Sequence, residues 1–197
     1  MKKLTLATLS TLALTLPCTN VFALDGTITV NGVVTDQTCT LKAGRSFTTG
    51  LKDLTVSMFS IPKSWFTTNP TSTGYAMLLF LTNADGTANC DVATTQAFKG
   101  VHLSVSSPND DLDATNKTLL VNRAIGAPTK NPVFIAMYAN NGKTVNFSEP
   151  WGTQAKSLIY NFNGETYLVY GVAYVSKTGI VDAQNYTAKI NYTMHYN

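Results

Sequence analysis

Apolar and polar residues alternate with a period of two along several short stretches of this chain. The first stretch is GTITVNGVVTDQTC (residues 26–39), which places apolar or small side chains on one face and mostly polar ones on the other. The last is YTAKINYTMHYN (residues 186–197), in which every second residue from Tyr186 is apolar or aromatic. Such alternation is typical of β-strands that bury one face. The pattern therefore predicts a strand near each end of the chain.

Further β-rich runs lie between these two segments and are separated by turn signals. YAMLLFLT (residues 75–82) is almost wholly apolar, and the turn residues that follow favour a central strand buried on both faces over a short buried helix. An Asn-Gly pair joins residues 133–138 to residues 143–147, which is a strong hairpin signal. The remaining predicted strands cover residues 54–59, 101–105 and 167–175. Short strands between frequent turns, with little helical periodicity, predict an all-β sandwich.

Residues 1–23 have the composition of a secretory signal peptide. A short basic start precedes an apolar stretch at residues 4–16, and VFA at residues 21–23 places small residues as a cleavage site requires. The apolar stretch is shorter than the roughly 20 residues that a membrane span needs, so a membrane anchor is the less favoured alternative. Lipoprotein processing at Cys18 is disfavoured by its polar flanks. We therefore expect export and removal of this segment.

Size and charge limit the classes of partner. Removal of residues 1–23 leaves 174 residues, which suits one domain with a sizeable core. The net charge falls from +3 to +1, because Lys2 and Lys3 are lost and no acidic residue is. A chain so close to neutrality offers no electrostatic case for nucleic acid or an anionic membrane as partner.

Two cysteines, Cys39 and Cys90, remain after the predicted cleavage. Export would bring them into an oxidising compartment, which favours a disulfide over two buried free thiols. The bond would close a loop of about 50 residues. A metal site is disfavoured, because the chain has no CxxC pair. It also has only two histidines, His102 and His195.

The sequence contains no catalytic motif. It lacks a GxSxG nucleophile elbow, an HExxH metal motif and a glycine-rich phosphate loop. The acidic run of Asp110, Asp111 and Asp113 could hold Ca²⁺, but it lacks the glycine and distal glutamate of an EF-hand loop, so a solvated turn is favoured. We therefore expect a protein that is not an enzyme and needs no cofactor.

The order of these motifs resembles the pilin subunits of chaperone–usher fimbriae, of the type 1 and P pilus kind and of the major type. The matching features are the alternating residues 26–39 that end in the first cysteine, a second cysteine after an apolar strand, and a final strand with Tyr196 next to last. The resemblance covers essentially the whole chain after the predicted leader. The chain departs from the family pattern at Gln184, where glycine is frequent, and in a longer stretch between the cysteines at residues 60–74.

The resemblance implies an incomplete immunoglobulin-like β-sandwich that lacks its last strand, with one disulfide between Cys39 and Cys90. Residues 24–36 would form an N-terminal donor-strand extension, and residues 37–197 the pilin domain. A periplasmic chaperone, and then the extension of a neighbouring subunit, would fill the groove left by the missing strand. The donor side chains would be Ile28, Val30, Gly32 and Val34. The acceptor groove and chaperone-facing strand would contain Ile190, Tyr192, Met194, Tyr196 and Asn197.

The implied function is that of a structural subunit of a bacterial surface fimbria, polymerised by donor-strand exchange. Its expected partners are a periplasmic chaperone, an outer-membrane usher and neighbouring subunits of the same kind. The alternative is a fimbrial subunit with side-on or tip adhesin activity toward a receptor on a host surface. Trp65, Phe66 and Trp151 are the aromatic candidates for such a contact, although packed loop residues are favoured.

Overall fold

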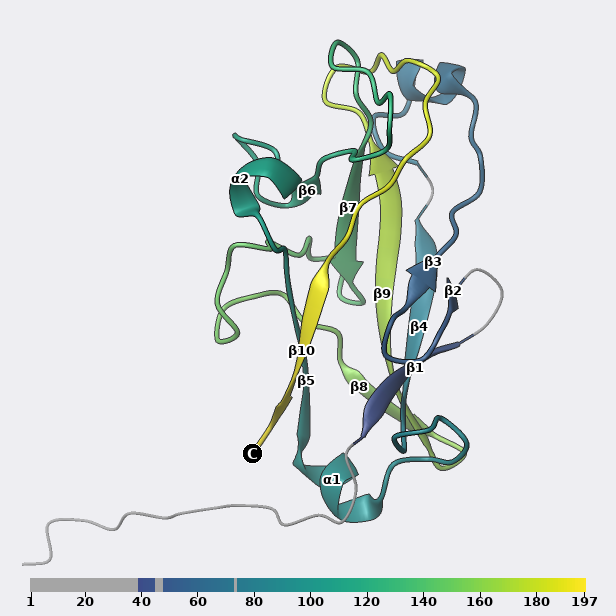
Figure 1. Ribbon diagram of the computed structural model, residues 1–197, viewed down its shortest axis with the longest axis vertical. Coiled ribbons are helices and arrows are strands. Elements are labelled where there is room, and N and C mark those ends of the chain that lie inside the picture. Colours follow the sequence, from purple (N-terminus) through teal and green to yellow (C-terminus); the bar gives the residue numbers. More distant parts are fainter. Residues whose placement is uncertain (1–38, 45–47, 73) are drawn as a thin grey trace, which may run out of the picture. The chain divides into compact units, whose positions relative to one another are not determined.

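The computed structural model describes residues 39–44, 48–72 and 74–197 (Figure 1). The strands are β1 (Thr40–Gly44), β2 (Thr48–Thr49), β3 (Thr55–Val56), β4 (Tyr75–Thr82), β5 (Phe98–Ser104), β6 (Leu119–Leu120), β7 (Phe134–Ala139), β8 (Ile159–Phe162), β9 (Glu165–Val175) and β10 (Asn191–Tyr196). The helical segments are η1 (Lys63–Thr67), α1 (Val92–Ala97) and α2 (Pro108–Asp111). No helix in this part of the chain is long and apolar enough to cross a membrane. The predicted signal peptide (residues 1–23) and donor-strand extension (residues 24–36) lie outside the described residues.

The strands are arranged in two main antiparallel sheets. The larger has the order β1-β4-β9-β7-β6, and β8 pairs with β9 beside it. The smaller sheet consists of β10 and β5, which lie alongside each other in Figure 1. A two-stranded ribbon, β2 with β3, follows β1. This arrangement fits the predicted incomplete immunoglobulin-like sandwich.

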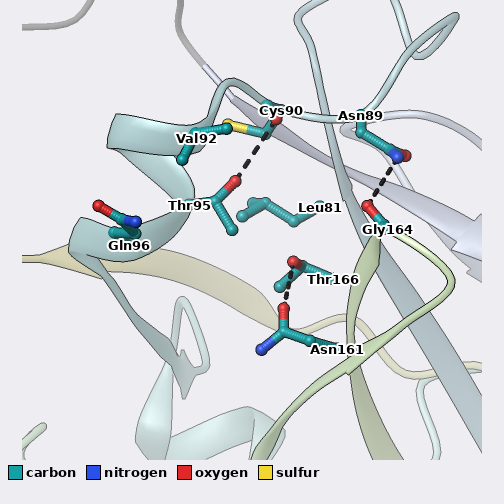
Figure 2. A pocket seen from close by; sticks show the side chains of 9 residues that line it. All are labelled: Leu81, Asn89, Cys90, Val92, Thr95, Gln96, Asn161, Gly164 and Thr166. Atoms are coloured by element: carbon teal, nitrogen blue, oxygen red, sulfur yellow. Dashed lines mark hydrogen bonds between the residues drawn. The ribbon is translucent and has the colours of Figure 1, made fainter.

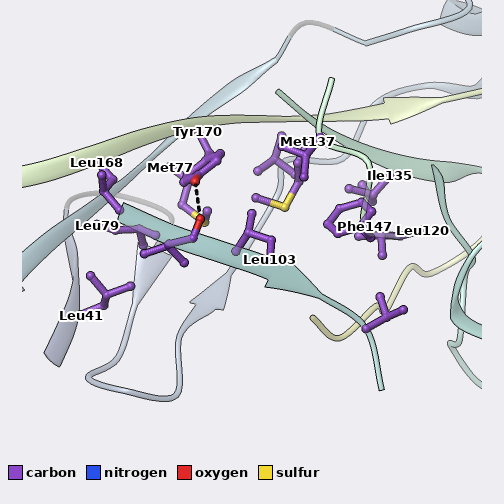
Figure 3. Packing of buried hydrophobic residues seen from close by; sticks show 14 of the residues in the cluster. Leu41, Met77, Leu79, Leu103, Leu120, Ile135, Met137, Phe147, Leu168 and Tyr170 are labelled. Carbon is purple, nitrogen blue, oxygen red and sulfur yellow. Dashed lines mark hydrogen bonds between the residues drawn. The ribbon is translucent and has the colours of Figure 1, made fainter. Parts of the chain in front are cut away.

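The main core is built from the alternating residues of β4, β5 and β9. Met77 and Leu79 of β4 are buried with Leu103 of β5 and Tyr170 of β9, and Figure 3 shows these side chains packed together. The strand predicted at residues 75–82 is confirmed with the same bounds. Its second face is only half-buried, however, so the predicted burial on both faces is wrong.

A disulfide joins Cys39, just before β1, to Cys90, just before α1. The two Cα atoms are 5.6 Å apart, and the residues are 51 positions apart in sequence. Both cysteines belong to the main core cluster. Next to them, the Asp91 side chain accepts a hydrogen bond from Thr94 N (2.9 Å) and thereby caps α1. The predicted pairing is confirmed, and it fixes the start of the sandwich to the loop after β4.

Two predicted strands are shorter than the sequence pattern suggested. The strand expected at residues 54–59 pairs regularly only over Thr55–Val56. The Asn-Gly turn after β7 is present, because Gly142 N donates to Ala139 O (2.9 Å) and Gly142 has a positive φ of 78°. Beyond it, the returning chain forms one isolated bridge at Thr144 rather than a full strand. Both hairpin arms thus exist, but only β7 is regular.

Candidate strand-acceptor site at the last strand

Within the described residues, β10 pairs with another strand along one edge only. It runs antiparallel to β5, with Tyr192 opposite Leu103 and Met194 opposite Val101. On its other side the described part of the chain contributes no paired strand. The last strand is therefore an edge strand of the described sheet.

The Gln154 side chain identifies which backbone groups point away from the β5–β10 ladder. Leu103 N donates to Gln154 Oε1 (2.9 Å), and Leu103 O accepts from Gln154 Nε2 (2.7 Å). Both groups of Leu103 therefore face away from β10. In an antiparallel pair, the residue opposite such a position also directs its N–H and C=O outward. Tyr192, and Met194 two residues later, hence present their backbone groups along the unpaired edge of β10.

A row of half-buried apolar side chains follows the same edge. Its members are Tyr186, Ala188, Ile190, Tyr192 and Met194. The residues between them are exposed, so the predicted two-residue alternation is confirmed over residues 186–194. It is wrong at the end of the strand, where His195 is half-buried and Tyr196 is exposed beyond a register shift. A second half-buried row, at Leu54, Val56 and Met58, packs against the same core cluster. The core is therefore incompletely covered where these two rows border it.

Tyr192 links the last strand to the segment that follows β1. Its hydroxyl donates to Lys52 O (2.9 Å). Burial raises the pKa of Tyr192 above its usual value, and a hydrogen bond with Thr40 partly offsets this effect. The phenol is therefore neutral at physiological pH and keeps its proton for the bond to Lys52.

Regular pairing of the last strand begins later than predicted, at Asn191 instead of Tyr186. The Tyr186 hydroxyl donates to Leu120 O (2.9 Å), and Thr187 O accepts from Arg123 N (2.7 Å). These bonds hold residues 186–187 on the loop after β6, away from β5.

Gln184 anchors the chain just before this segment. Its Oε1 accepts from Asn122 Nδ2 (2.9 Å) and from Val133 N (3.2 Å). Its Nε2 donates to the carbonyl oxygens of Asn131 (3.1 Å) and Asp182 (2.9 Å). The departure from the family pattern at this position thus places a four-bond anchor at the entry to the last strand.

The polar face of β10 carries His195, which stacks on Trp151 with ring centroids 4.0 Å apart and planes 3° apart. Lys156 Nζ lies 4.4 Å from the Trp151 ring centroid and donates to Trp151 O (2.6 Å). Burial, followed by the charges of His102 and Lys156, lowers the pKa of His195, so its imidazole is neutral at neutral pH. Trp151 is therefore half-buried and packs against His195 and Lys156.

Tyr196 and Asn197 lie beside the start of β5. The Tyr196 ring packs on Phe98 with centroids 5.6 Å apart, and Asn197 N donates to Ala97 O (3.0 Å). A register shift separates His195 from Tyr196. The contact of both residues with a chaperone stays a prediction.

Loop residues 60–74 contain η1, which positions the two aromatic residues that were candidates for a ligand contact, Trp65 and Phe66. Phe66 is only 3% exposed and packs with Val133 and Val181 in a small second core. The favoured packed position is confirmed for Phe66 and the alternative of an exposed contact is wrong, because these distant partners enclose the ring. Trp65 keeps 38% of its surface exposed, and its Nε1 donates to Thr71 O (3.3 Å).

Substitution of these two neighbours should have unequal effects on stability. We expect Phe66→Ala to lower the free energy of unfolding by about 3–5 kcal/mol, because it leaves a cavity in a closed cluster. Trp65→Ala should cost about 1 kcal/mol, typical of a point mutant. Chemical denaturation of the two variants measures both values. A larger loss for Trp65→Ala would contradict the burial described above.

The three aspartates of the acidic run each form an ion pair or a hydrogen bond. Asp113 pairs with Lys177 (3.0 Å), and Asp111 lies 3.7 Å from Arg123. Asp110 accepts a hydrogen bond in the first turn of α2. Asp111 also accepts from Ser107 N (3.0 Å), so two of the three carboxylates bond the residue that begins this turn.

A small pocket of about 190 Å³ lies beside the disulfide (Figure 2). Asn89 Nδ2 donates to Gly164 O (2.7 Å), and Thr166 Oγ1 donates to Asn161 Oδ1 (2.6 Å), so polar groups on its wall are bonded to one another. The described residues that line it include no acid, base or free thiol. The hydroxyls of Thr95 and Thr166 therefore have no acidic or basic side chain beside them in the described wall of this pocket.

No family model matches the sequence. The chain is 26% identical to the F17 fimbrial protein of Escherichia coli over 174 residues, which cover 88% of each chain. The crystal structure of the P pilus rod subunit PapA matches with a TM-score of 0.55 at 18% identity, over 87% of this chain and 100% of that one. A chaperone–usher pilus structure matches with a TM-score of 0.50 at 18% identity, over 87% and 95%. The chain is thus similar in sequence to a fimbrial protein along most of its length, and it shares the fold of the pilus subunits.

Proposed function

We propose that the chain is a structural subunit of a bacterial surface fimbria and polymerises by donor-strand exchange. In this proposal residues 1–23 direct export, a periplasmic chaperone assists folding of residues 37–197, and an outer-membrane usher receives the subunit. The unpaired edge of β10, with its half-buried apolar row, carries the proposal. Similarity to pilus subunits supports assembly with other subunits and a place in a surface appendage.

The other sheet edges of the described residues are short or covered. The β1 edge is occupied by the chain that follows it, since Ala43 N donates to Gly50 O (3.0 Å). The β6 strand spans two residues and bridges to Leu112, and β8 spans four. Proteins blunt edge strands in this way to prevent association, often with lysine or proline. Asn191–Tyr196 spans six residues and contains neither, which supports a role as an acceptor.

Residues 24–36 have the pattern that such an edge requires of a donor. An added strand would bond the outward backbone groups of Tyr192 and Met194, and every second side chain would fall on the half-buried row. The donor side chains would be Ile28, Val30, Gly32 and Val34. Each of the three branched side chains would contribute about 1.5–3 kcal/mol on burial, before the cost of ordering the segment. Glycine in the series would permit a close approach of the two backbones.

Amide hydrogen exchange before and after polymerisation tests this proposal. We expect exchange at Tyr192 and Met194 to slow by about a hundredfold or more in fibres, equivalent to about 2.7 kcal/mol of added local stability. Thr193 is the internal control, because its alternate position directs its amide to β5 in both states. Equal slowing at Thr193, or no change at Tyr192 and Met194, would contradict strand addition at this edge.

A further inference from the structure

We propose that the Gln154 carboxamide is a specificity-determining group that closes the outer edge of β5. The small sheet then accepts a donor strand at β10 alone. This inference rests on the proposed donor-strand function, but it concerns the opposite edge of the same sheet and a residue outside the acceptor row.

The Gln154 side chain bonds to β5 as the backbone of an adjoining strand would. Its Oε1 accepts from Leu103 N (2.9 Å) and its Nε2 donates to Leu103 O (2.7 Å), which is the reciprocal pair that an antiparallel neighbour makes. The second Nε2 hydrogen is donated to Asn146 O (2.8 Å). Gln154 is 2% exposed, so water does not compete for these bonds. One side chain thereby replaces a strand at this position.

A second outward group of β5 is also occupied. The hydroxyl of Tyr170, from the opposite sheet, donates to Val101 O (3.4 Å). Trp151 lies over the face of the sheet at Gly100, where an added Cβ would be 3.3 Å from the indole, and so does not cover the edge itself. Gln154 and Tyr170 thus occupy outward backbone groups of two successive positions of this edge, Leu103 and Val101.

The two edges of this two-stranded sheet are therefore unequal. On β10, the outward backbone groups of Tyr192 and Met194 meet no strand of the described chain. On β5, those of Leu103 are occupied by Gln154. A sheet open at both edges could accept two strands, and its polymers would branch or associate laterally. Closure of β5 restricts each subunit to one acceptor site.

Gln154→Leu in the full chain, assembled with its chaperone and usher, tests this role. We expect fibres with branch points or lateral bundles in electron micrographs, and exchange of the Leu103 amide faster by about tenfold or more. Asn140→Leu is the matched control, because the Asn140 carboxamide bonds the Tyr160 hydroxyl and Leu158 N (3.1 Å) but no group of β5 or β10. It should give unbranched fibres and unchanged exchange at Leu103.

Unbranched fibres from Gln154→Leu would overturn the inference. Branching in both variants would also overturn it, since general destabilisation would then be the cause. If Gln154→Leu does not accumulate, Gln154→Glu serves with the same readouts, because it keeps an acceptor for Leu103 N but has no donor for Leu103 O.

In the unaltered monomer, the Leu103 amide must exchange more slowly than that of Tyr192, and equal rates would refute edge closure. That comparison needs no fibre, so it separates this inference from the donor-strand proposal.

Discussion

Deletion of residues 24–36 from the full chain should abolish fibres while leaving a soluble complex of the subunit with its chaperone. The deleted segment contains the proposed donor residues but none of the strands β1–β10, so the acceptor edge stays intact. The variant should accept a donor strand but be unable to provide one. Electron microscopy of the cell surface and size-exclusion chromatography of periplasmic extracts measure the two outcomes. Normal fibres from this variant would refute the donor-strand proposal.

Point substitutions within the same segment provide a matched control. Replacement of Ile28, Val30 and Val34 by serine removes about 4.5 kcal/mol or more of apolar burial in total. Dissociation of subunits should then become faster by about a thousandfold. The same replacement at Thr27, Thr29 and Asn31, which alternate with them, should have little effect. The release of monomers from fibres heated in detergent measures the effect of the apolar and the polar substitutions. Equal release from the two variants would contradict the burial of one face of the segment.

Loss of the disulfide should be the second large effect. In the chain-entropy model a bond between residues 51 positions apart contributes about 4 kcal/mol. Domains of this size have about 5–15 kcal/mol of stability in all. We therefore expect the double variant Cys39→Ser, Cys90→Ser to accumulate poorly in the periplasm and to unfold at much lower denaturant concentration.

Cys18→Ser is the control for that experiment. Cys18 lies in the predicted signal peptide, so its replacement should change neither yield nor the denaturation midpoint. Titration of free thiols in the unaltered protein should detect none without reductant, because both remaining sulfurs form the bond. A double variant with an unchanged midpoint would show that the sandwich is held by its core alone.

The sequence predicts this structure best where local pattern alone determines it. The strand at Tyr75–Thr82 has its predicted bounds because a long apolar run ends in turn residues, and the faces of residues 186–194 follow from simple alternation. The start of β10 could not be predicted in this way. Its position depends on contacts such as the hydrogen bond from Tyr186 to Leu120, which lies 66 residues away.

Two side chains of the functional region show the same limit. Phe66 stands in a Pro- and Thr-rich loop that suggests exposure, but its burial depends on Val133 and Val181. The residues next to Gln154 in sequence give no sign that its side chain bonds to a strand, because its partner Leu103 is 51 residues away. Local periodicity contains no information on such contacts, so both roles become evident only in three dimensions.

The single open edge of β10 also has a geometric consequence for the assembled polymer. A subunit with one acceptor edge and one donor segment would join its neighbours through two different surfaces, which generates an open, polar filament in place of a closed ring when the rotation does not close. The two ends of that filament would be chemically distinct. One would present a vacant edge and the other an unused donor, so a terminating subunit for one end could not substitute at the other.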